Sequence, residues 1–274
     1  MECTNKYFIA NDKVVKTENF LEYNGEGVKL YEVIRIIEGI PLFIEEHIKR
    51  FHSSSKKSGK ELFISDDEIK EAIKKLTKEN NCYMGNVKIV FCYSEIKYFL
   101  CYFIEHSYPD QDMYLNGVKT ITYKASRLNP EVKAVNESLK SQIKKVLQEN
   151  PVYEVLLLNS DLEITEGSKS NVLFIKGNRI ISSPMETILR GITREKIMNI
   201  CRELGFETEE RMVNREEIHE FEACFLTGTS PKVLPISYID DVKFDVKNKI
   251  LLKIKEKYEE EITTYIFDAK KNEL

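Results

Sequence analysis

The chain has 274 residues, a net charge of −4, 42% hydrophobic residues and 31% charged residues. This length and balance indicate one large or two moderate globular domains. The slightly acidic chain has no basic stripe, which argues against nucleic acid as its main partner. Residues 1–16 lack the apolar run of a signal peptide, and no segment approaches the roughly 18 apolar residues of a membrane span.

The six cysteines are scattered along the chain, without a CxxC pair or a histidine at metal-ligand spacing. We therefore expect no metal site. Cys92 and Cys101 lie in apolar runs typical of strands, where a reduced cysteine acts as a small hydrophobic residue. A cytoplasmic location is the simplest expectation. The histidines, His47 among them, show no ligand spacing and are interpreted as surface or supporting residues.

Residues 1–110 are predicted to form a small α+β domain. The segment 31–44 alternates and then breaks at Glu38-Gly39, a pattern typical of a β-hairpin. Residues 45–59 and 65–80 carry apolar residues at helical spacing and predict two helices. Two strands are predicted at 86–94 and 97–106.

A linker is predicted at 111–117, where turn residues occur without periodicity. Residues 118–274 are predicted to form a larger second domain. Its strands are expected at 118–124, 153–159, 164–183, 206–213 and 222–230, and its helices at 136–150, 193–205, 214–221 and 248–262. Because strands and helices mix without regular βαβ alternation, the predicted fold class is α+β, not a doubly wound sheet.

Three polar clusters interrupt apolar sequence in the second part of the chain. ITEGSKSNVLF (164–174) sets Glu166 beside a glycine at the edge of a strand, and LRGITREK (189–196) offers Thr193 as a helix N-cap. FLTGTS (225–230) ends an apolar strand in hydroxyls around Gly228. A helix N-terminus and free amides around a glycine suit a phosphate group. Taken alone, the last two clusters are better explained as a capped helix and an ordinary strand-end turn. P-loop and GxSxG motifs are absent.

Six motifs taken in order resemble the class IV pyridoxal-phosphate enzymes, also called fold-type IV. This family contains branched-chain aminotransferases, D-amino-acid aminotransferases and aminodeoxychorismate lyases. The motifs are YEVIR, EEHIKR, PEVK, EGSKSN, LRGITR and FLTGTS, and the resemblance covers about residues 31–235. The resemblance implies a two-domain α+β fold, with a small N-terminal α/β sandwich and a larger C-terminal pseudo-barrel domain that binds pyridoxal 5′-phosphate.

The resemblance also implies residue roles. Lys133 would form the internal aldimine with the cofactor aldehyde and later act as the base between substrate Cα and cofactor C4′. Glu166 would face the pyridine nitrogen and keep it protonated, while Ser168 and Asn171 would shape the loop around the ring. The implied phosphate ligands are Arg50, Gly191, Ile192, Thr193, Gly228 and Thr229.

Further roles come from the D-amino-acid branch of the family. Tyr31 and Glu32 match positions near the substrate carboxylate and the lysine, and Arg127 resembles the arginine partner of that glutamate. A Glu32–Arg127 pair near the cofactor phenolate is therefore a hypothesis. The chain departs from this branch in FIEHSYPDQ, which holds His106 without an adjacent arginine. His106 is a candidate ligand of the substrate carboxylate.

The function implied by the resemblance is transfer of an amino group between an amino acid and a 2-oxo acid. A lyase of the aminodeoxychorismate type would use the same lysine and cofactor but eliminate pyruvate. A non-catalytic relative is a third alternative, against which the presence of Lys133, Glu166, Arg50 and Thr229 argues. The resemblance further implies a homodimer and small-molecule partners only.

Overall fold

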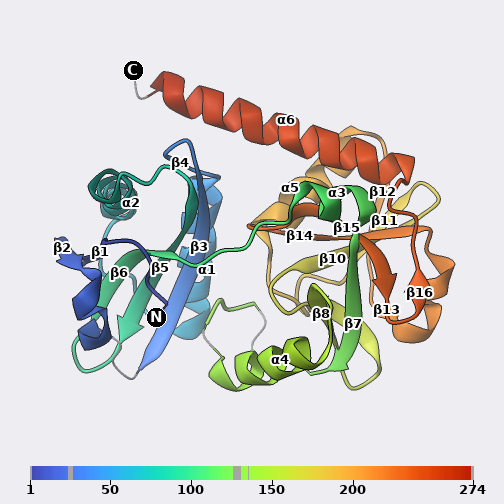
Figure 1. Cartoon of the computed structure of the whole chain (residues 1–274), viewed down its shortest axis with the longest axis horizontal. Coiled ribbons are helices and arrows are strands. Elements are labelled where there is room, and N and C mark those ends of the chain that lie inside the picture. The colour runs from blue at the N-terminus through green and yellow to red at the C-terminus, as the bar shows by residue number, and fades with distance from the viewer. Residues whose placement is uncertain (1, 24–26, 126–130, 135, 273–274) are drawn as a thin grey trace. The chain divides into compact units, whose positions relative to one another are not determined.

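The computed structural model describes residues 2–23, 27–125, 131–134 and 136–272 and has the α+β class that the sequence predicts (Figure 1). The chain divides into two compact units. The first comprises residues 1–107, 132–135 and 262–274, and the second comprises 108–131 and 136–261. The segments 132–135 and 262–274 thus return to the first unit, and no turn signal or change of composition marks these returns in the sequence.

The first unit is built on a six-stranded antiparallel sheet with the strand order β2-β1-β6-β5-β3-β4. Its strands are β1 (Tyr7–Ala10), β2 (Lys13–Lys16), β3 (Val28–Ile37), β4 (Ile40–Pro41), β5 (Gly85–Tyr93) and β6 (Tyr98–Ile104). Its helical segments are η1 (Thr17–Tyr23), α1 (Ile44–Ser58) and α2 (Asp66–Asn80). The turn between β3 and β4 has φ values of 53° at Glu38 and 84° at Gly39, which explains the break in the sequence pattern.

The two faces of this sheet have different partners because side chains alternate along a strand. Leu30, Ile34 and Ile36 of β3 pack with the apolar stripes of α1 and α2. Tyr31 of the same strand packs on the opposite face, in a cluster with Val90. The alternation places Glu32 on the helix-covered face and Tyr31 on the other.

The second unit is built on a ten-stranded mixed sheet with the order β12-β11-β10-β14-β15-β7-β8-β9-β13, and β16 pairs with β15. Its strands are β7 (Val118–Lys124), β8 (Glu154–Leu158), β9 (Glu163–Gly167), β10 (Asn171–Lys176), β11 (Arg179–Ser182), β12 (Glu207–Glu210), β13 (Val213–Asn214), β14 (Ala223–Gly228), β15 (Lys232–Ile239) and β16 (Val242–Lys243). The sequence pattern assigns no element to the range of β15, which carries Pro235 in its middle. The structure pairs β15 antiparallel to β14 and parallel to β7, with a register shift between Ile236 and Tyr238 in the pairing with β7.

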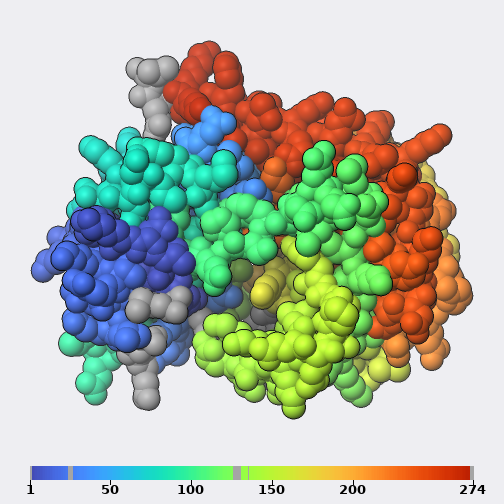
Figure 2. All heavy atoms as spheres, in the orientation of Figure 1, coloured from blue at the N-terminus to red at the C-terminus, as the bar shows by residue number. Residues whose placement is uncertain are grey.

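The helical segments of this unit are α3 (Gln111–Asn116), α4 (Glu137–Glu149), α5 (Ile192–Glu203) and η2 (Arg215–Glu220). The last helix, α6 (Lys249–Asn272), begins in this unit and ends in the first. α3 occupies the range predicted as a linker, and Asp110 caps it by accepting a hydrogen bond from Met113 N at 2.9 Å. α4 buries Leu139 and Ile143, and the rest of the helix lies at the surface, in yellow-green in Figure 2.

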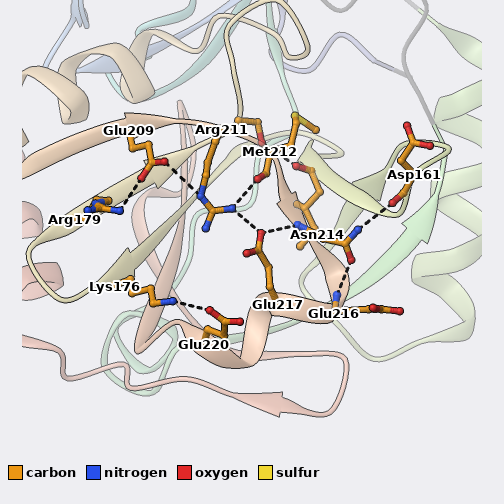
Figure 3. A network of polar contacts seen from close by, with 12 residues as sticks. Asp161, Lys176, Arg179, Glu209, Arg211, Met212, Asn214, Glu216, Glu217 and Glu220 are labelled. Carbon is orange, nitrogen blue, oxygen red and sulfur yellow. Dashed lines mark hydrogen bonds and ion pairs between the residues drawn. The ribbon is translucent and has the colours of Figure 1, made fainter.

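A polar network connects η2 with β12 and β13, the strands at the two ends of the second sheet (Figure 3). Arg211 Nη1 donates to Met212 O at 2.8 Å and to Glu217 Oε1 at 2.6 Å. Glu217 Oε1 also accepts from Asn214 N, which completes a capping box at the start of η2. These contacts hold the segment that leads from β12 through β13 into η2.

No helix in the described part of the chain combines the length and the apolar content needed to cross a membrane. All six cysteines are free thiols, and all except Cys82 are buried.

The N-terminus of α2 offers a direct test of local stability. Ser65 Oγ accepts from Glu68 N at 3.3 Å, and Glu68 Oε2 accepts from Ser65 N at 2.7 Å. We expect Ser65→Ala to lower the free energy of unfolding by about 1 kcal/mol, because it leaves helix amides without this cap. Urea denaturation measures the change, with Ser53→Ala on the exposed face of α1 as the control. Equal stability of the two variants would contradict the capping role.

Candidate active site

The EGSKSN motif forms a tight loop between β9 and β10. Gly167 N donates to Ser170 O at 2.8 Å and closes the loop. Glu166, the penultimate residue of β9, is 3% exposed, and its Oε2 accepts from Leu189 N at 3.1 Å and from Asn171 Nδ2 at 3.3 Å. The carboxylate that the sequence singles out is therefore buried and oriented by groups on both sides of the loop.

A second buried carboxylate, that of Glu154 in β8, fills the inside of this loop. Its Oε1 accepts from Ser168 Oγ at 2.6 Å and from Val155 N at 2.9 Å. Its Oε2 accepts from Ser170 Oγ at 3.0 Å and from Lys169 N at 3.2 Å. Glu154 is 4% exposed, so the loop donors replace the water that a buried carboxylate would lose. Glu154 thereby fixes the segment that joins Glu166 to Asn171.

The LRGITR motif forms the start of α5 beside the same loop. Asn171 Nδ2 donates to Leu189 O at 3.0 Å. A Cβ placed on Gly191 would lie 1.9 Å from Asn171 Oδ1, so only glycine allows this approach. Gly191 is the N-cap, and within the described residues no side chain caps the first amides of the helix. The prediction of Thr193 as the N-cap was wrong, because α5 begins at Ile192 and Thr193 lies inside its first turn.

Arg194 anchors the first turn of α5, and its side chain is buried, with 1% of its surface exposed. Its guanidinium donates to Ser182 Oγ at 2.7 Å, to Ser183 O at 3.1 Å and to Glu210 Oε1 at 2.9 Å. A buried guanidinium needs such a full set of acceptors. The first amides of α5 are therefore anchored to the ends of β11 and β12.

The FLTGTS motif lies next to the EGSKSN loop because β14 pairs with β10. Asn171 is the register partner of Thr227, and a Cβ placed on Gly228 would lie 3.6 Å from Lys169 O. Thr227 is fully buried, and its Oγ1 has no hydrogen-bond partner among the described residues. A buried hydroxyl in this state is a natural place for a ligand or water to bind. Three motifs far apart in the sequence thus converge in the second unit.

In the first unit, Glu32 is the centre of a buried charge cluster. Its Oε1 accepts from Arg50 Nε at 2.7 Å, and its Oε2 accepts from Arg50 Nη2 at 2.5 Å. His47 Nδ1 lies 2.8 Å from Oε2. His47 and Arg50 are three residues apart on α1, so both face β3. Arg50, predicted as a phosphate ligand, holds Glu32 with one edge of its guanidinium.

The pKa values in this cluster define its charges. Burial by itself would raise the pKa of Glu32, but the charge of Arg50 and the hydrogen bonds from His47 and Arg50 outweigh it and lower the pKa to about 2. Burial lowers the pKa of His47 below 6.5, with Arg50 and Lys133 acting in the same direction and Glu32 opposing them. At neutral pH the cluster therefore consists of an anionic Glu32, a cationic Arg50 and a neutral His47.

Lys133 lies beside Tyr31 in the same unit. Tyr31 N donates to Lys133 O at 3.1 Å, and Lys133 Nζ is 5.0 Å from the centroid of the Tyr31 ring. Lys133 and Tyr31 are therefore neighbours, while Glu32 faces the other side of the sheet, and the roles of all three at the site stay predictions. Arg127 lies outside the described residues, so the proposed Glu32–Arg127 pair stays a prediction.

His106 lies at the surface just beyond β6, with Nδ1 3.3 Å from Ile104 O and its ring against Gly85. Its role as a carboxylate ligand remains a prediction.

Two residues of the candidate site, His47 and Glu154, are not predicted from the sequence. His47, interpreted there as a surface or supporting residue, is 4% exposed and bonded to Glu32. The sequence offered one signal for each residue. His47 lies three residues before Arg50, and Glu154 is the single charged residue in the apolar segment YEVLLLN.

Comparison with known proteins gives a consistent result. Residues 29–239 match the family model described as amino-transferase class IV. The chain is 33% identical over 229 residues to a D-alanine aminotransferase of Bacillus licheniformis, with 79% of this chain and 80% of that protein covered. It is 26% identical to a putative branched-chain-amino-acid aminotransferase of Methanocaldococcus jannaschii, with 86% and 87% covered.

Solved structures show the same fold. The T.th. branched-chain amino acid aminotransferase complexed with N-(5′-phosphopyridoxyl)-L-glutamate superposes with a TM-score of 0.82 at 22% identity and covers 96% of each chain. A putative 4-amino-4-deoxychorismate lyase of Legionella pneumophila superposes with a TM-score of 0.75 at 22% identity, covering 83% of this chain and 89% of that one. At 22% identity, these likenesses establish only that the chain shares the fold of these proteins. Its reaction must be argued from the residues of the site.

The position of Glu154 leads to a prediction about stability. We expect Glu154→Gln to lower the free energy of unfolding by about 1–3 kcal/mol, because the amide NH₂ would face loop donors in place of an acceptor. Glu163→Gln is the matched control, since Glu163 is half-buried in the same hairpin and accepts from Asn159 Nδ2 outside the loop. Urea denaturation compares the two variants. A loss for Glu154→Gln no larger than that for Glu163→Gln would contradict the loop-fixing role.

The lowered pKa values in the Glu32 cluster predict acid sensitivity. Below pH 6.5 the unfolded chain protonates His47 while the folded chain does not, so stability falls with pH. Below 4.5 the same argument applies to Glu32, whose stabilising charge is lost as pH falls toward 2. We expect His47→Asn to flatten the decrease between pH 7 and 5 in thermal denaturation. The control is His52→Asn, an exposed residue of α1. An unchanged slope in His47→Asn would exclude His47 as the source.

Proposed function

Because the chain belongs to the class IV aminotransferases, we propose that it exchanges an amino group between an amino acid and a 2-oxo acid, with pyridoxal 5′-phosphate as its cofactor. The observation that carries this proposal is the convergence of EGSKSN, LRGITR and FLTGTS in the second unit. A buried carboxylate, an uncapped helix start and a buried hydroxyl lie together there.

The residues present fit the chemical groups of this cofactor. A phosphate dianion suits the first amides of α5, which no side chain in the described ranges caps. Gly191, Ile192 and Thr193 would bind it there, with Gly228, Thr229 and Arg50 as further proposed ligands. The Thr227 hydroxyl, which lacks a partner among the described residues, is consistent with a ligand bound nearby.

Glu166 would hold a proton on the pyridine nitrogen. Its Oε2 is already oriented by Leu189 N and Asn171 Nδ2, so little reorganisation is needed when a cationic N–H approaches. Ser168 and Asn171 would keep the loop in place, and Glu154 holds the residues in the middle of it. The protonated pyridine ring supplies the electron sink that allows the substrate Cα proton to leave.

Lys133 would hold the cofactor by its amine and, once released, move the proton at the substrate Cα. The charge cluster of Glu32, Arg50 and neutral His47 lies on the neighbouring strand and helix, where it adds no net charge. Glu32 and Arg127 are proposed to lie near the phenolate oxygen. Tyr31 and His106 are proposed to face the substrate carboxylate.

The same proposal includes a cellular location and an oligomeric state. The free state of all six cysteines supports a reducing, cytoplasmic location. The resemblance to the family supports a homodimer. No other partner class is proposed beyond the amino acid and the 2-oxo acid.

A first test is chemical labelling of Lys133. We expect the purified protein to absorb visible light, to bleach on borohydride treatment and to carry the pyridoxyl group on the peptide that contains Lys133. Lys133→Ala should lose the label and at least about 100-fold in transaminase rate, because it removes the base. Lys124→Ala, at the exposed end of β7, is the control and should behave as the wild type. Label on another lysine would overturn the assignment.

Dependence on a 2-oxo acid separates this proposal from the lyase alternative. A transaminase turns over its amino donor only when an acceptor is present or until the cofactor is fully aminated. Release of pyruvate from aminodeoxychorismate without any acceptor would favour the lyase.

A further inference from the structure

Lys88 is a buried cation on the face of the first sheet that α1 and α2 do not cover. Its neighbours Val87 and Ile89 pack with those helices, and strand alternation turns Lys88 to the opposite face. Lys88 is 8% exposed. A lysine is seldom buried to this extent without a partner, so the groups around its ammonium indicate what the site is built to hold.

The partner of Lys88 is a carboxylate, and the carboxylate has a second ligand. Lys88 Nζ pairs with Glu2 Oε1, and Tyr102 OH lies 3.2 Å from Glu2 Oε2. Lys88 and Tyr102 are direct register partners on β5 and β6. A cation and a hydroxyl on adjacent strands therefore hold the two oxygens of one carboxylate. We call Lys88 and Tyr102 the carboxylate clamp.

The clamp lies close to Lys133. Lys88 Nζ is 4.8 Å from the centroid of the Tyr31 ring, and Lys133 Nζ is 5.0 Å from the same centroid. The two nitrogens can therefore be no more than about 10 Å apart, the sum of those distances. This span is within reach of one amino acid or 2-oxo acid whose reacting carbon is at Lys133.

Glu2 can leave the clamp without the N-terminal segment detaching. The side chain of Glu2 is 45% exposed. The segment is held to the sheet by its backbone, through the bridge between Cys3 and Ile104 and the hydrogen bond from Thr4 N to Phe103 O at 2.9 Å. The clamp is therefore not needed to attach this segment.

We propose that the carboxylate clamp of Lys88 and Tyr102 binds a carboxylate of the substrate, and that Glu2 competes for it from within the chain. This inference rests on the proposed function, because it places the substrate beside Lys133. The carboxylate is either the α-carboxylate common to all amino acids and 2-oxo acids or the side-chain carboxylate of an acidic one. In both cases the substrate replaces Glu2 on Lys88 Nζ and Tyr102 OH.

The test separates ligand binding from the ion pair itself. The double variant Glu2→Lys with Lys88→Glu restores an ion pair but leaves an anion on the sheet. We expect the double variant to unfold at the same temperature as the wild type. We expect its KM for amino donors to rise roughly 10- to 100-fold, because the substrate carboxylate loses a charge-assisted hydrogen bond. Lys88→Met and Tyr102→Phe should raise KM in the same way with little change in kcat. Glu2→Gln should lower KM, because it removes the competitor.

The control is Lys119→Met, since Lys119 is an exposed lysine that also lies over a tyrosine ring, that of Tyr238. Kinetics with alanine and with glutamate identify the carboxylate. A KM raised for both assigns the α-carboxylate, and a KM raised for glutamate alone assigns the side-chain group. Unchanged KM values in Lys88→Met and in the double variant would overturn the clamp.

Calorimetric titration with maleate provides a readout that does not depend on turnover. We expect maleate to bind the wild type and Glu2→Gln, the latter more tightly, and to bind Lys88→Met roughly tenfold more weakly. Equal affinities in all three would overturn the inference. Absence of the pyridoxyl label on Lys133 in the wild type would instead contradict the proposed function, and the maleate titration would still decide whether the clamp binds carboxylates.

Discussion

Burial of the Glu154 carboxylate is the constraint on which the candidate cofactor site depends. A carboxylate removed from water must be satisfied by hydrogen bonds or it destabilises the fold. Here the donors come from Val155 and from three successive residues of the EGSKSN loop, Ser168, Lys169 and Ser170. The loop can satisfy Glu154 in few other conformations, and this fixes Glu166 at one end and Asn171 at the other. Asn171 in turn holds the start of α5 through Leu189 and its contact with Gly191.

The first unit uses a second buried carboxylate in the same way. Glu32 lies fully buried on β3, and its charge is matched by Arg50 and hydrogen-bonded by His47, both from α1. This contact fixes the register between a helix and a strand that also carries Tyr31, the residue next to Lys133. In each unit, a buried carboxylate thus helps to determine where neighbouring residues of the candidate site lie. Such buried polar groups specify one arrangement while adding little net stability.

The sequence predicts well those features whose cause is local. The turn at Glu38-Gly39 and the capped helix after Ser65 follow from turn and capping chemistry within a few residues. The motifs at Glu166, Gly191 and Gly228 are also local, and their resemblance to one family identified them. Contacts between distant residues are not visible in this way. Glu154 meets its donors 14 to 16 residues later, and Glu32 meets His47 15 residues later. β15 escapes prediction because a proline stands where a central strand is not expected.

A crystal structure of the protein with pyridoxal 5′-phosphate would test the central claim most directly. We predict that the cofactor is joined to Lys133 Nζ, that its pyridine nitrogen lies within hydrogen-bond distance of Glu166, and that its phosphate contacts the first amides of α5. The Glu154 contacts to the loop should be unchanged. A phosphate bound away from α5, or a pyridine nitrogen without Glu166 beside it, would contradict this assignment of the site.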